Sequence, residues 1–442
     1  MTTPAKTVQT KIDPAQAASF WNKFAHWLTP KRIRAQAAVL ALCLWGVCAV
    51  DFATPGLVDR AGNIKFQDFL PLYISSRLIA QGHATDLYNP QITADAMQVI
   101  IGQPISAQPI SAQPGRVRLP FLYGPQVGLF FLPVARFSFP VAARIWVAVS
   151  LLVFTACIYL LWKTCPNLRP HSRTILLCAV AFPPLFHFLV RGQLSALVLA
   201  CFTAAFLAFR ADRKFLAGVA LGFLVFKPQF LVAIPLILLL AHAWKAFAGL
   251  VLAATAQLAI TAIYFGPAVM RAYSDSLWHL SRVIDGLEPG LAPIQMHSLR
   301  SFWTLLIPLP PAALALYVLS SIVVICIAAA VWKSSSPLAL RFSALTLAAV
   351  LANPHLFVYD LLMLAPVLLL LMDWTLLNLQ PASSPTLQVL LYLVFVLPLF
   401  GPLSRWTHLQ LSVPAFAALL WVLWRQSAIP SRKLASHEAA VV

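Results

Sequence analysis

Residues 36–57 read QAAVLALCLWGVCAVDFATPGL and directly follow the basic residues Lys31, Arg32 and Arg34. A run of about 20 apolar residues is long enough to cross the hydrocarbon core of a bilayer as a helix. Basic residues in front of such a helix predict that the N-terminus stays in the cytosol. No clear small-residue cleavage site follows, so we interpret the run as an uncleaved signal anchor behind a cytosolic tail, residues 1–35.

The composition of the whole chain is that of an all-α polytopic membrane protein. Of its 442 residues, 60% are hydrophobic and 10% charged, with a mean hydropathy of +0.82, and apolar runs recur along the sequence. The formal net charge of +18 comes from short basic clusters between those runs. That pattern reports membrane topology, with anionic lipid as a second possibility, so we expect the lipid bilayer as a partner and no nucleic acid.

The cysteines indicate neither a disulfide framework nor a zinc site. All seven fall outside any C-x-x-C motif, and most lie within apolar segments, where a free thiol packs as a small hydrophobic group.

Residues 58–120 form a long polar stretch with balanced acids and bases, which we predict to be the first extracytoplasmic loop. Apolar residues recur at helical spacing over 68–82 and 90–101, which predicts two helices lying in the membrane interface. Between them and the next apolar run, residues 103–114 repeat the unit QPISA, and the prolines favour an extended linker. A second long loop is predicted at 266–300.

The number of membrane spans follows from the placement of the basic clusters. Thirteen apolar segments can be counted, which would leave the basic C-terminal residues outside. All basic clusters face the cytosol only if the segment 121–136, interrupted by Pro125 and Pro133, does not cross. We therefore predict about twelve transmembrane helices within a membrane domain at 36–425, with a cytosolic C-terminal tail at 426–442.

This topology gathers several polar residues on the outer face with Asp68. Arg191, Lys227 and His355 all interrupt apolar sequence there, and a charge at a membrane edge is either a snorkelling anchor or a ligand for substrate. Lys227 is the most informative, because the apolar segments on its two sides are too short to be ordinary spans. It could balance an anionic group such as a lipid phosphate, or simply anchor the chain.

Two further residues on or near this face allow two interpretations each. His297, like His355, could hydrogen-bond a phosphate or a sugar hydroxyl, or be structural. Asp360 lies inside an apolar helix, where a carboxylate is costly unless it is paired. It could be catalytic, or pair with a basic residue of a neighbouring helix. The acids of the 266–300 loop lack metal-ligand spacing, and no G-x-S-x-G, H-E-x-x-H or phosphate-cradling glycine loop occurs.

The order and spacing of these motifs resemble glycosyltransferase family 87, over about residues 36–425. The matching residues are Asp68-Phe69 with Tyr73, Arg77, Gly82 and Leu87-Tyr88; Leu122-Tyr123-Gly124-Pro125 with Leu132-Pro133; Gly192-Gln193; Ala217-Gly218 to Lys227-Pro228-Gln229; Met296-His297-Ser298; and Asn353-Pro354-His355 to Tyr359-Asp360. The family belongs to the C-type superfamily of multi-span enzymes, which includes polyprenyl-phosphate-mannose-dependent mannosyltransferases. One departure is Tyr123-Gly124-Pro125, where the family usually has Tyr-Pro-Pro.

The resemblance implies transfer of a hexose from a polyprenyl-phosphate donor to an acceptor hydroxyl on a glycolipid or glycan, outside the membrane and with inversion. It implies Asp68 as the general base, since inverting chemistry needs a carboxylate opposite the leaving group. Lys227, Arg191 and His355 would hold the donor phosphate, without a metal or other cofactor. The remaining residues expected to bind substrate are Tyr73, Tyr123, Gln193, Gln229, His297 and Asp360.

Two other classes of membrane protein remain as alternatives. A transporter or flippase of a lipid-linked sugar would have a similar composition, although we see no sign of the inverted repeat that many transporters carry. A polysaccharide ligase or polymerase would concentrate its function in one large outer loop. In each case we expect a multi-pass protein of the cell membrane, the inner membrane if the source is Gram-negative, with both termini in the cytosol.

Overall fold

The computed structural model describes residues 14–60, 62–102, 119–279, 292–377 and 384–428. Within these ranges every regular element is a helix, and the only β-type pairings are two isolated bridges, Val58 with Ile64 and Met296 with Phe357. Six helices are long and apolar enough to cross a membrane, and a seventh span results if the bent pair Pro166–Val180 and Pro183–Arg191 counts as one. The multi-pass helical class predicted from the sequence is therefore confirmed at this level.

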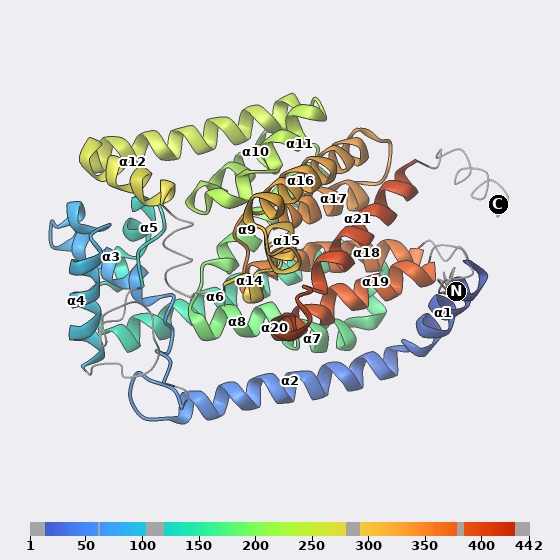
Figure 1. The fold of residues 1–442 in the computed structure, drawn as a ribbon, viewed down its shortest axis with the longest axis horizontal. Helices are drawn as coiled ribbons and strands as arrows, with labels where there is room; N and C mark the ends of the chain where they lie inside the picture. The colour runs from blue at the N-terminus through green and yellow to red at the C-terminus, as the bar shows by residue number, and fades with distance from the viewer. Residues whose placement is uncertain (1–13, 61, 103–118, 280–291, 378–383, 429–442) are drawn as a thin grey trace, which may run out of the picture.

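The long helices run roughly parallel to the longest axis of the molecule (Figure 1). In chain order the first half contains α1 (Pro14–Trp27), α2 (Pro30–Ala53), α3 (Leu70–Ala80), η1 (Ala84–Asp86), α4 (Pro90–Ile101), α5 (Pro125–Phe130), η2 (Leu132–Val134), α6 (Phe139–Lys163), η3 (Pro166–His171), α7 (Ser172–Val180), α8 (Pro183–Arg191), α9 (Ser195–Arg210), α10 (Lys214–Gly222), η4 (Phe223–Phe226), η5 (Pro228–Leu231) and α11 (Ile234–Leu240). The second half contains α12 (Trp244–Trp278), α14 (Ala292–Gln295), α15 (Leu299–Leu306), α16 (Pro310–Lys333), α17 (Leu338–Leu351), η6 (Val358–Leu364), α18 (Ala365–Leu377), α19 (Ser384–Val396), η7 (Leu397–Leu403), α20 (Ser404–Thr407) and α21 (Ser412–Ser427).

Proline in the first turn starts many of these helices, since its fixed φ and missing N–H suit that position. Examples are α2, α6 and α16. The best-defined boundaries belong to α4, where the Asn89 side chain accepts hydrogen bonds from Gln91 and Ile92, and Gly102 ends the helix in the left-handed region.

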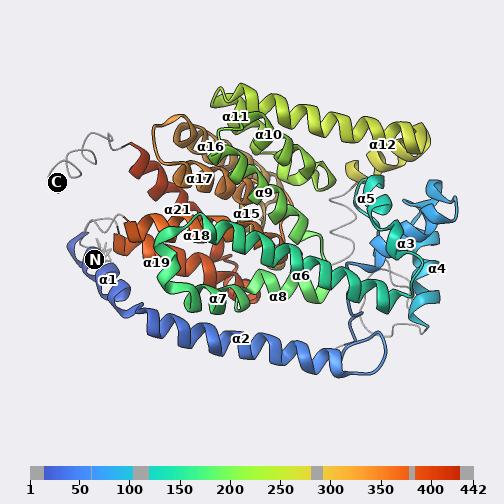
Figure 2. The ribbon, with the colours of Figure 1, turned by 180° about the vertical axis from the view of Figure 1, so that it is seen from behind.

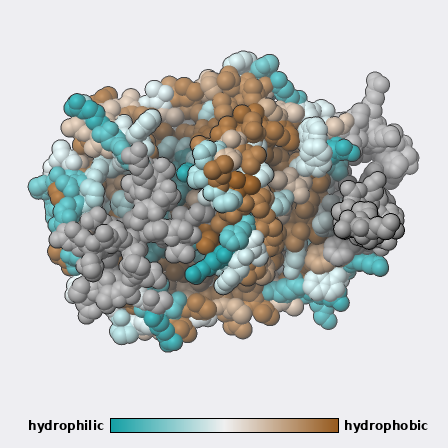
Figure 3. Space-filling view, viewed as in Figure 1, coloured by the Kyte–Doolittle hydropathy of each residue, from teal (hydrophilic) through white to brown (hydrophobic). Residues whose placement is uncertain are grey.

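The core of the bundle is built around α17. Every residue of α17 from Phe342 to Leu351 is buried. The largest hydrophobic cluster joins this helix to α9, α11, α16, α18 and α21. In contrast, α2 lies along the outside of the bundle with Ala37 as its one buried residue, as both ribbon views show (Figures 1 and 2). Hydrophobic residues gather across the middle of the face in Figure 3, and hydrophilic ones mostly toward its two ends.

A small helical cap covers one end of the bundle. It consists of α3, α4 and α5 together with the second limb of α12, which bends at Gly266 in the left-handed region (Figure 1). The sequence predicted helices near 68–82 and 90–101, and α3 and α4 are there. However, α3 is buried on nearly every side instead of lying on the membrane surface, because the other cap helices and α6 pack around it.

Several apolar segments are shorter or more broken than the sequence suggested. Of the predicted twelve spans, the length and composition of the helices support six or seven, and four other apolar helices of the bundle have 10–17 residues each: Ser195–Arg210, Lys214–Phe226, Pro228–Leu240 and Leu338–Leu351. In the segment 121–136, the longest helix is α5, whose six residues are too short to cross the membrane. The predicted loop at 266–300 begins with the helical second limb of α12. The repeat at 103–114 and residues 1–13 and 429–442 of the two predicted tails lie outside the described residues, whereas 14–35 form α1 and the start of α2.

Glycines allow α10 and α12 to pack with their backbones in close contact. A Cβ added to Gly218 would collide with the carbonyl oxygen of Ala246, and one added to Gly249 with that of Phe215. Gly222 faces Leu250 in the same manner. Small residues that bring helix backbones together are a main source of helix association in membranes, where hydrophobic burial offers little gain.

We expect Gly218→Ala to destabilise the protein by about 1–3 kcal/mol, because the added methyl group meets rigid backbone. Gly46→Ala on α2 is the matched control, since a Cβ there has no neighbour within 4 Å. Thermal unfolding in detergent measures both. Equal melting temperatures for the two variants would show that the α10–α12 contact tolerates the methyl group.

Candidate functional site

Asp68 is held against the bundle by the turn between α8 and α9. Its backbone N–H donates to the carbonyl oxygen of Arg191 over 3.0 Å. Gly192 follows in the left-handed region with φ of 73°, and a Cβ on it would lie 2.7 Å from Cβ of Phe69. Only glycine fits both requirements. The Trp146 indole donates to the Gly192 carbonyl over 3.0 Å and closes the turn from the other side.

Gln193 connects Asp68 to the interior of the bundle. Its Nε2 donates to Oδ2 of Asp68 over 2.8 Å. Its Oε1 accepts from the Tyr123 hydroxyl at 2.9 Å, the Leu194 N–H at 3.3 Å and Nζ of Lys227 at 3.5 Å. Lys227 and the backbone N–H can only donate, and a carboxylate can only accept, so the orientation of the amide is determined by its partners.

Lys227 and Asp360 form a buried ion pair next to Gln193. Nζ of Lys227 lies 2.6 Å from Oδ1 of Asp360, and both side chains are 2% exposed. The hydroxyl of Ser195 donates to the same carboxylate oxygen over 3.3 Å. The rings of Tyr123 and Tyr359 lie 5.9 and 5.4 Å from the ammonium. The structure therefore gives Asp360 a partner on a neighbouring element, one of the two interpretations open from the sequence.

The accessible part of the cluster is at Asp68 and Arg191. Nη1 of Arg191 is 3.9 Å from Oδ2 of Asp68, with side chains 28% and 16% exposed respectively. Among the described residues, the contacts to the Asp68 carboxylate fall on Oδ2.

The structure brings three more predicted residues, Tyr123, Gln229 and His355, into or near the cluster and separates two, Tyr73 and His297, from it. Tyr123 contributes its hydroxyl, whose pKa is raised well above the usual value, first by burial and then by the Asp360 and Asp68 charges, so it stays a donor. Gln229 is half-buried on η5, two residues after Lys227. Tyr73 is separated: it is 1% exposed, and its hydroxyl donates to the Phe137 carbonyl over 2.7 Å. Tyr73 therefore occupies a packing position inside the cap.

The two predicted histidines are held in their neutral forms. Burial lowers the pKa of His355 to about 3, and the positive charges of Lys227 and Arg300 add to the effect. A neutral His355 can hydrogen-bond a phosphate but adds no positive charge to balance it at neutral pH. Burial likewise lowers the pKa of His297 to about 3, with the nearby His187 adding to it.

His297 is separated from the Asp68 cluster by its own contacts. It is 1% exposed, and its Nδ1 lies 2.8 Å from the Ser412 hydroxyl. Its backbone N–H donates to Leu356, where the α14–α15 turn meets the chain entering η6. These contacts join the last helix to the turn before η6.

Two residues with polar contacts in this region, Ser195 and Lys65, stood in no sequence motif that pointed to chemistry. Ser195 contacts Asp360, as described above. Lys65 donates to the carbonyl oxygens of Thr54, Gly56 and Phe52 at 2.6, 3.2 and 3.4 Å, and so binds the loop to the end of α2. The last carbonyl groups of a helix have no partner within the helix, and a nearby lysine can donate hydrogen bonds to them. The position of Lys65 after α2 is therefore the signal that the sequence offered for these contacts.

A comparison with protein families places these residues in context. The sequence model of glycosyltransferase family 87 matches residues 121–358, which is more than half of the chain. The chain belongs to glycosyltransferase family 87. This family 87 protein is therefore a glycosyltransferase, and it has several helices of membrane-spanning length. Searches of curated proteins and of solved structures gave no match.

The matched region contains part of the cluster. Tyr123, Arg191, Gln193, Lys227 and His355 lie inside it. Asp68 precedes the match and Asp360 follows it by two residues, so the match is narrower than the resemblance inferred from the motifs. The link between Asp68 and the family region is the hydrogen bonding to Arg191 and Gln193. Among the described residues, no group of three or more His, Cys, Asp or Glu is placed to hold a metal ion.

We expect Gly192→Ala to reduce transferase activity strongly, because the new Cβ would push Phe69 and the neighbouring Asp68 away from the turn. Gly82→Ala is the control: its φ of 81° is equally unfavourable for alanine, but the added Cβ would meet no atom within 4 Å. Strain in the left-handed region costs each variant roughly 1 kcal/mol. Equal activities would mean that the contact with Phe69 does not position Asp68.

We expect the free energy of unfolding to decrease as pH falls from about 6.5 toward 3, with His297 contributing. Its pKa is about 3 in the folded protein and 6.5 in the unfolded chain. Between these values the unfolded chain binds more protons, so acid favours unfolding, by about 2 kcal/mol at pH 5 for this one group. Chemical unfolding of the protein and of His297→Asn at pH 7 and pH 5 tests this. The variant should have a lower free energy of unfolding at pH 7, yet lose less of it between pH 7 and pH 5. Equal losses in the two proteins would exclude His297 as a source of the pH dependence.

Proposed function

We propose that this family 87 enzyme transfers a hexose, mannose in particular, from a polyprenyl-phosphate donor to an acceptor hydroxyl of a glycolipid or glycan. The reaction would take place at the extracytoplasmic face with inversion at the anomeric carbon. The observation that carries the proposal is the cluster in which Asp68, partly accessible, is hydrogen-bonded through Gln193 to the buried pair of Lys227 and Asp360. The transporter alternative has no support from the family match.

Asp68 is the proposed general base. As the acceptor oxygen attacks the anomeric carbon, Oδ1 would take the hydroxyl proton while the bond from that carbon to the phosphate oxygen breaks on the opposite face. Gln193 and Arg191 both contact Oδ2, so they would fix the carboxylate with its other oxygen toward the acceptor. The departing lipid phosphate takes the bonding electron pair, and the proton remains on Asp68 until solvent removes it.

Arg191 and Lys227 are the proposed groups for the donor phosphate. Arg191 is the more accessible cation, and its guanidinium suits a phosphate oxygen pair. Lys227 is buried and already paired with Asp360. Its positive charge would stabilise the phosphate at a distance, because the site contains little water to screen it. Alternatively, Lys227 would leave Asp360 and bind the donor phosphate directly. His355 would donate a hydrogen bond as a neutral ring. We assign Tyr123, Gln193, Gln229 and Asp360 to the walls of the substrate site, and Tyr73 and His297 to its support.

The proposed placement is a multi-pass protein of the cell membrane with both termini in the cytosol. The N-terminal end of α1 and the C-terminal end of α21 lie at the end of the bundle away from the cap (Figure 1). With those ends inside, the cap and the cluster would face the extracytoplasmic side. In a Gram-negative source the membrane would be the inner one.

Asp68→Asn should lower the transfer of mannose from a polyprenyl-phosphate donor by roughly 10²–10⁴-fold, the usual contribution of a general base. Asp86→Asn, an acid on η1 that faces His83, is the control and should stay near the activity of the unchanged protein. Both are assayed as purified protein with a radiolabelled donor, and unfolding curves establish that each is folded. Near-normal turnover in Asp68→Asn would remove Asp68 from the mechanism.

Lys227→Ala should cost roughly 3–5 kcal/mol of stability, because it leaves Asp360 buried without its charge partner. The double variant Lys227→Met with Asp360→Leu removes both charges and should recover most of that loss. If Lys227 serves the donor, the double variant folds but keeps a raised KM for the donor with little change in the KM for the acceptor. If the double variant regains both its stability and the donor KM of the unchanged protein, Lys227 has only a structural role.

A further inference from the structure

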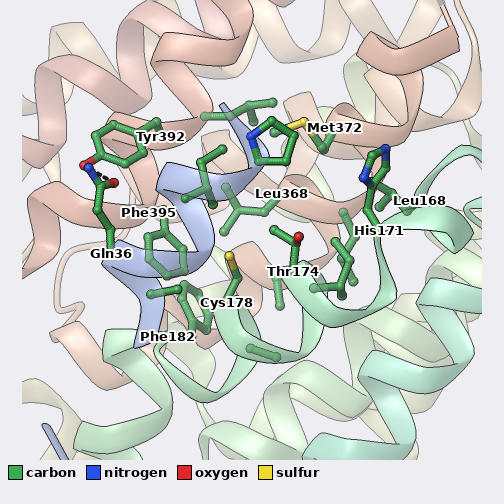
Figure 4. A pocket seen from close by; sticks show the side chains of 18 of the residues that line it. Gln36, Leu168, His171, Thr174, Cys178, Phe182, Leu368, Met372, Tyr392 and Phe395 are labelled. Atoms are coloured by element: carbon green, nitrogen blue, oxygen red, sulfur yellow. Dashed lines mark hydrogen bonds between the residues drawn. The ribbon is translucent and has the colours of Figure 1, made fainter. Parts of the chain in front are cut away.

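An apolar cavity of about 410 Å³ lies on the far side of the bundle from Asp68. Its walls come from the first turns of α2, from η3 and α7, from the second half of α6, and from α18 and α19 (Figure 4). On α2 the lining residues are Pro30, Ile33, Gln36, Ala37 and Leu40, which is the spacing of one helix face. The volume falls within the range of roughly 300–1,000 Å³ that holds small ligands and lipid chains.

The cavity is distinct from the proposed donor site. Leu40 is the last α2 residue that lines it, and α2 continues for 13 residues to Ala53 before loop one begins. At 1.5 Å per residue, that is about 20 Å of helix between the cavity and the start of the loop that contains Asp68. No residue of the Asp68 cluster lines the cavity.

Two polar features line the cavity, and the second of them can bind a ligand oxygen. At one end, the Tyr392 hydroxyl donates to Oε1 of Gln36 over 3.1 Å, as the dashed line in Figure 4 shows. Near the middle, Thr174 is among the lining side chains, and its hydroxyl is buried without a hydrogen-bond partner. A buried hydroxyl without a partner costs free energy that a ligand oxygen would restore.

The rim of the cavity is positively charged. Exposed Lys31, Arg32 and Arg34 flank the lining residues Pro30 and Ile33 on α2. On the opposite wall, exposed Arg169 and Arg173 flank the lining residue His171.

An acid next to the rim, Asp373, is held by hydrogen bonds from its own chain. Asp373 is next to the lining residue Met372, but its Oδ1 accepts the backbone N–H groups of Asn167 and Leu168 at 2.8 and 3.2 Å. It therefore caps the turn at η3. The rim as a whole carries an excess of cations near an apolar interior.

We propose that this cavity binds an anionic diacyl phospholipid, with one acyl chain inside and its phosphate at the basic rim. The apolar walls match the chain, and the five cations match the headgroup, each worth about 1 kcal/mol near a membrane surface. An ester oxygen of the lipid would accept the unpaired Thr174 hydroxyl. Bound lipid would fill the space between α2 and the bundle, where α2 is otherwise joined to α7 by the Trp45 indole donating to the Val180 carbonyl over 2.9 Å.

Photolabelling of the full-length protein in phosphatidylcholine vesicles tests the proposal. The probes are phosphatidylglycerol and phosphatidylcholine that carry the same diazirine-bearing acyl chain, with crosslinked peptides located by mass spectrometry. We expect phosphatidylglycerol to label peptides spanning 28–40 and 171–179 about fivefold more than phosphatidylcholine does. Equal labelling by the two probes would overturn the proposal, and so would displacement by a polyprenyl phosphate at lower concentration than by phosphatidylglycerol.

Matched variants separate the cavity from the lipid-facing surface. Ala37→Phe fills the cavity, whereas Leu42→Phe adds bulk where the side chain is 76% exposed. Labelling should fall several-fold in the first and stay unchanged in the second; equal labelling in both would place the lipid outside the cavity. Ala179→Phe fills the cavity from the α7 wall and replaces Ala37→Phe if that variant does not fold. The double variant Arg32→Gln with Arg173→Gln should lower labelling by phosphatidylglycerol toward the level of phosphatidylcholine. An unchanged preference for phosphatidylglycerol would show that the basic rim does not bind the headgroup.

Discussion

The burial of Lys227 and Asp360 inside an apolar bundle is the constraint on which the rest of the site depends. Each charge alone would be too costly at that depth, so the two must meet, and their contact joins η4 and η5 to η6 across 133 positions of sequence. The ammonium also contacts Oε1 of Gln193, whose amide then has its donor end toward Asp68. The position of the accessible carboxylate thus follows from a pair of charges that are themselves inaccessible.

The site is assembled where apolar segments are interrupted. Arg191-Gly192-Gln193 and Lys227-Pro228 lie between helices of at most 16 residues, shorter than a full span, and Asn353-Pro354-His355 follows α17, which has 14 residues. Backbone that is not helical is tolerated at membrane depth only when it is buried in protein or lines a polar space. These interruptions let the α8–α9 turn, Lys227 and Asp360 meet Asp68 and Tyr123 in one cluster beside the cap.

The two ends of the bundle differ in chemistry. The cap end combines a partly exposed carboxylate, Asp68, with Arg191 and the buried Lys227. The opposite end has exposed cations around an apolar cavity and no accessible acid among the lining residues. This asymmetry favours an enzyme with one reactive face over a carrier, which needs ionisable groups near the midplane.

The sequence by itself determined the helical membrane class, the family, the positions of α3 and α4, and most of the polar residues that meet at the site. Hydropathy and helical spacing are local properties, so they can be read from neighbouring residues. Only the tertiary structure decided that Lys227 pairs with Asp360, that Tyr73 points into the cap, that His355 is neutral, and that α3 is buried. Each of these depends on which distant segments pack together, because burial and charge partners set the cost of a charge and the pKa of a ring, and neither is encoded within one segment.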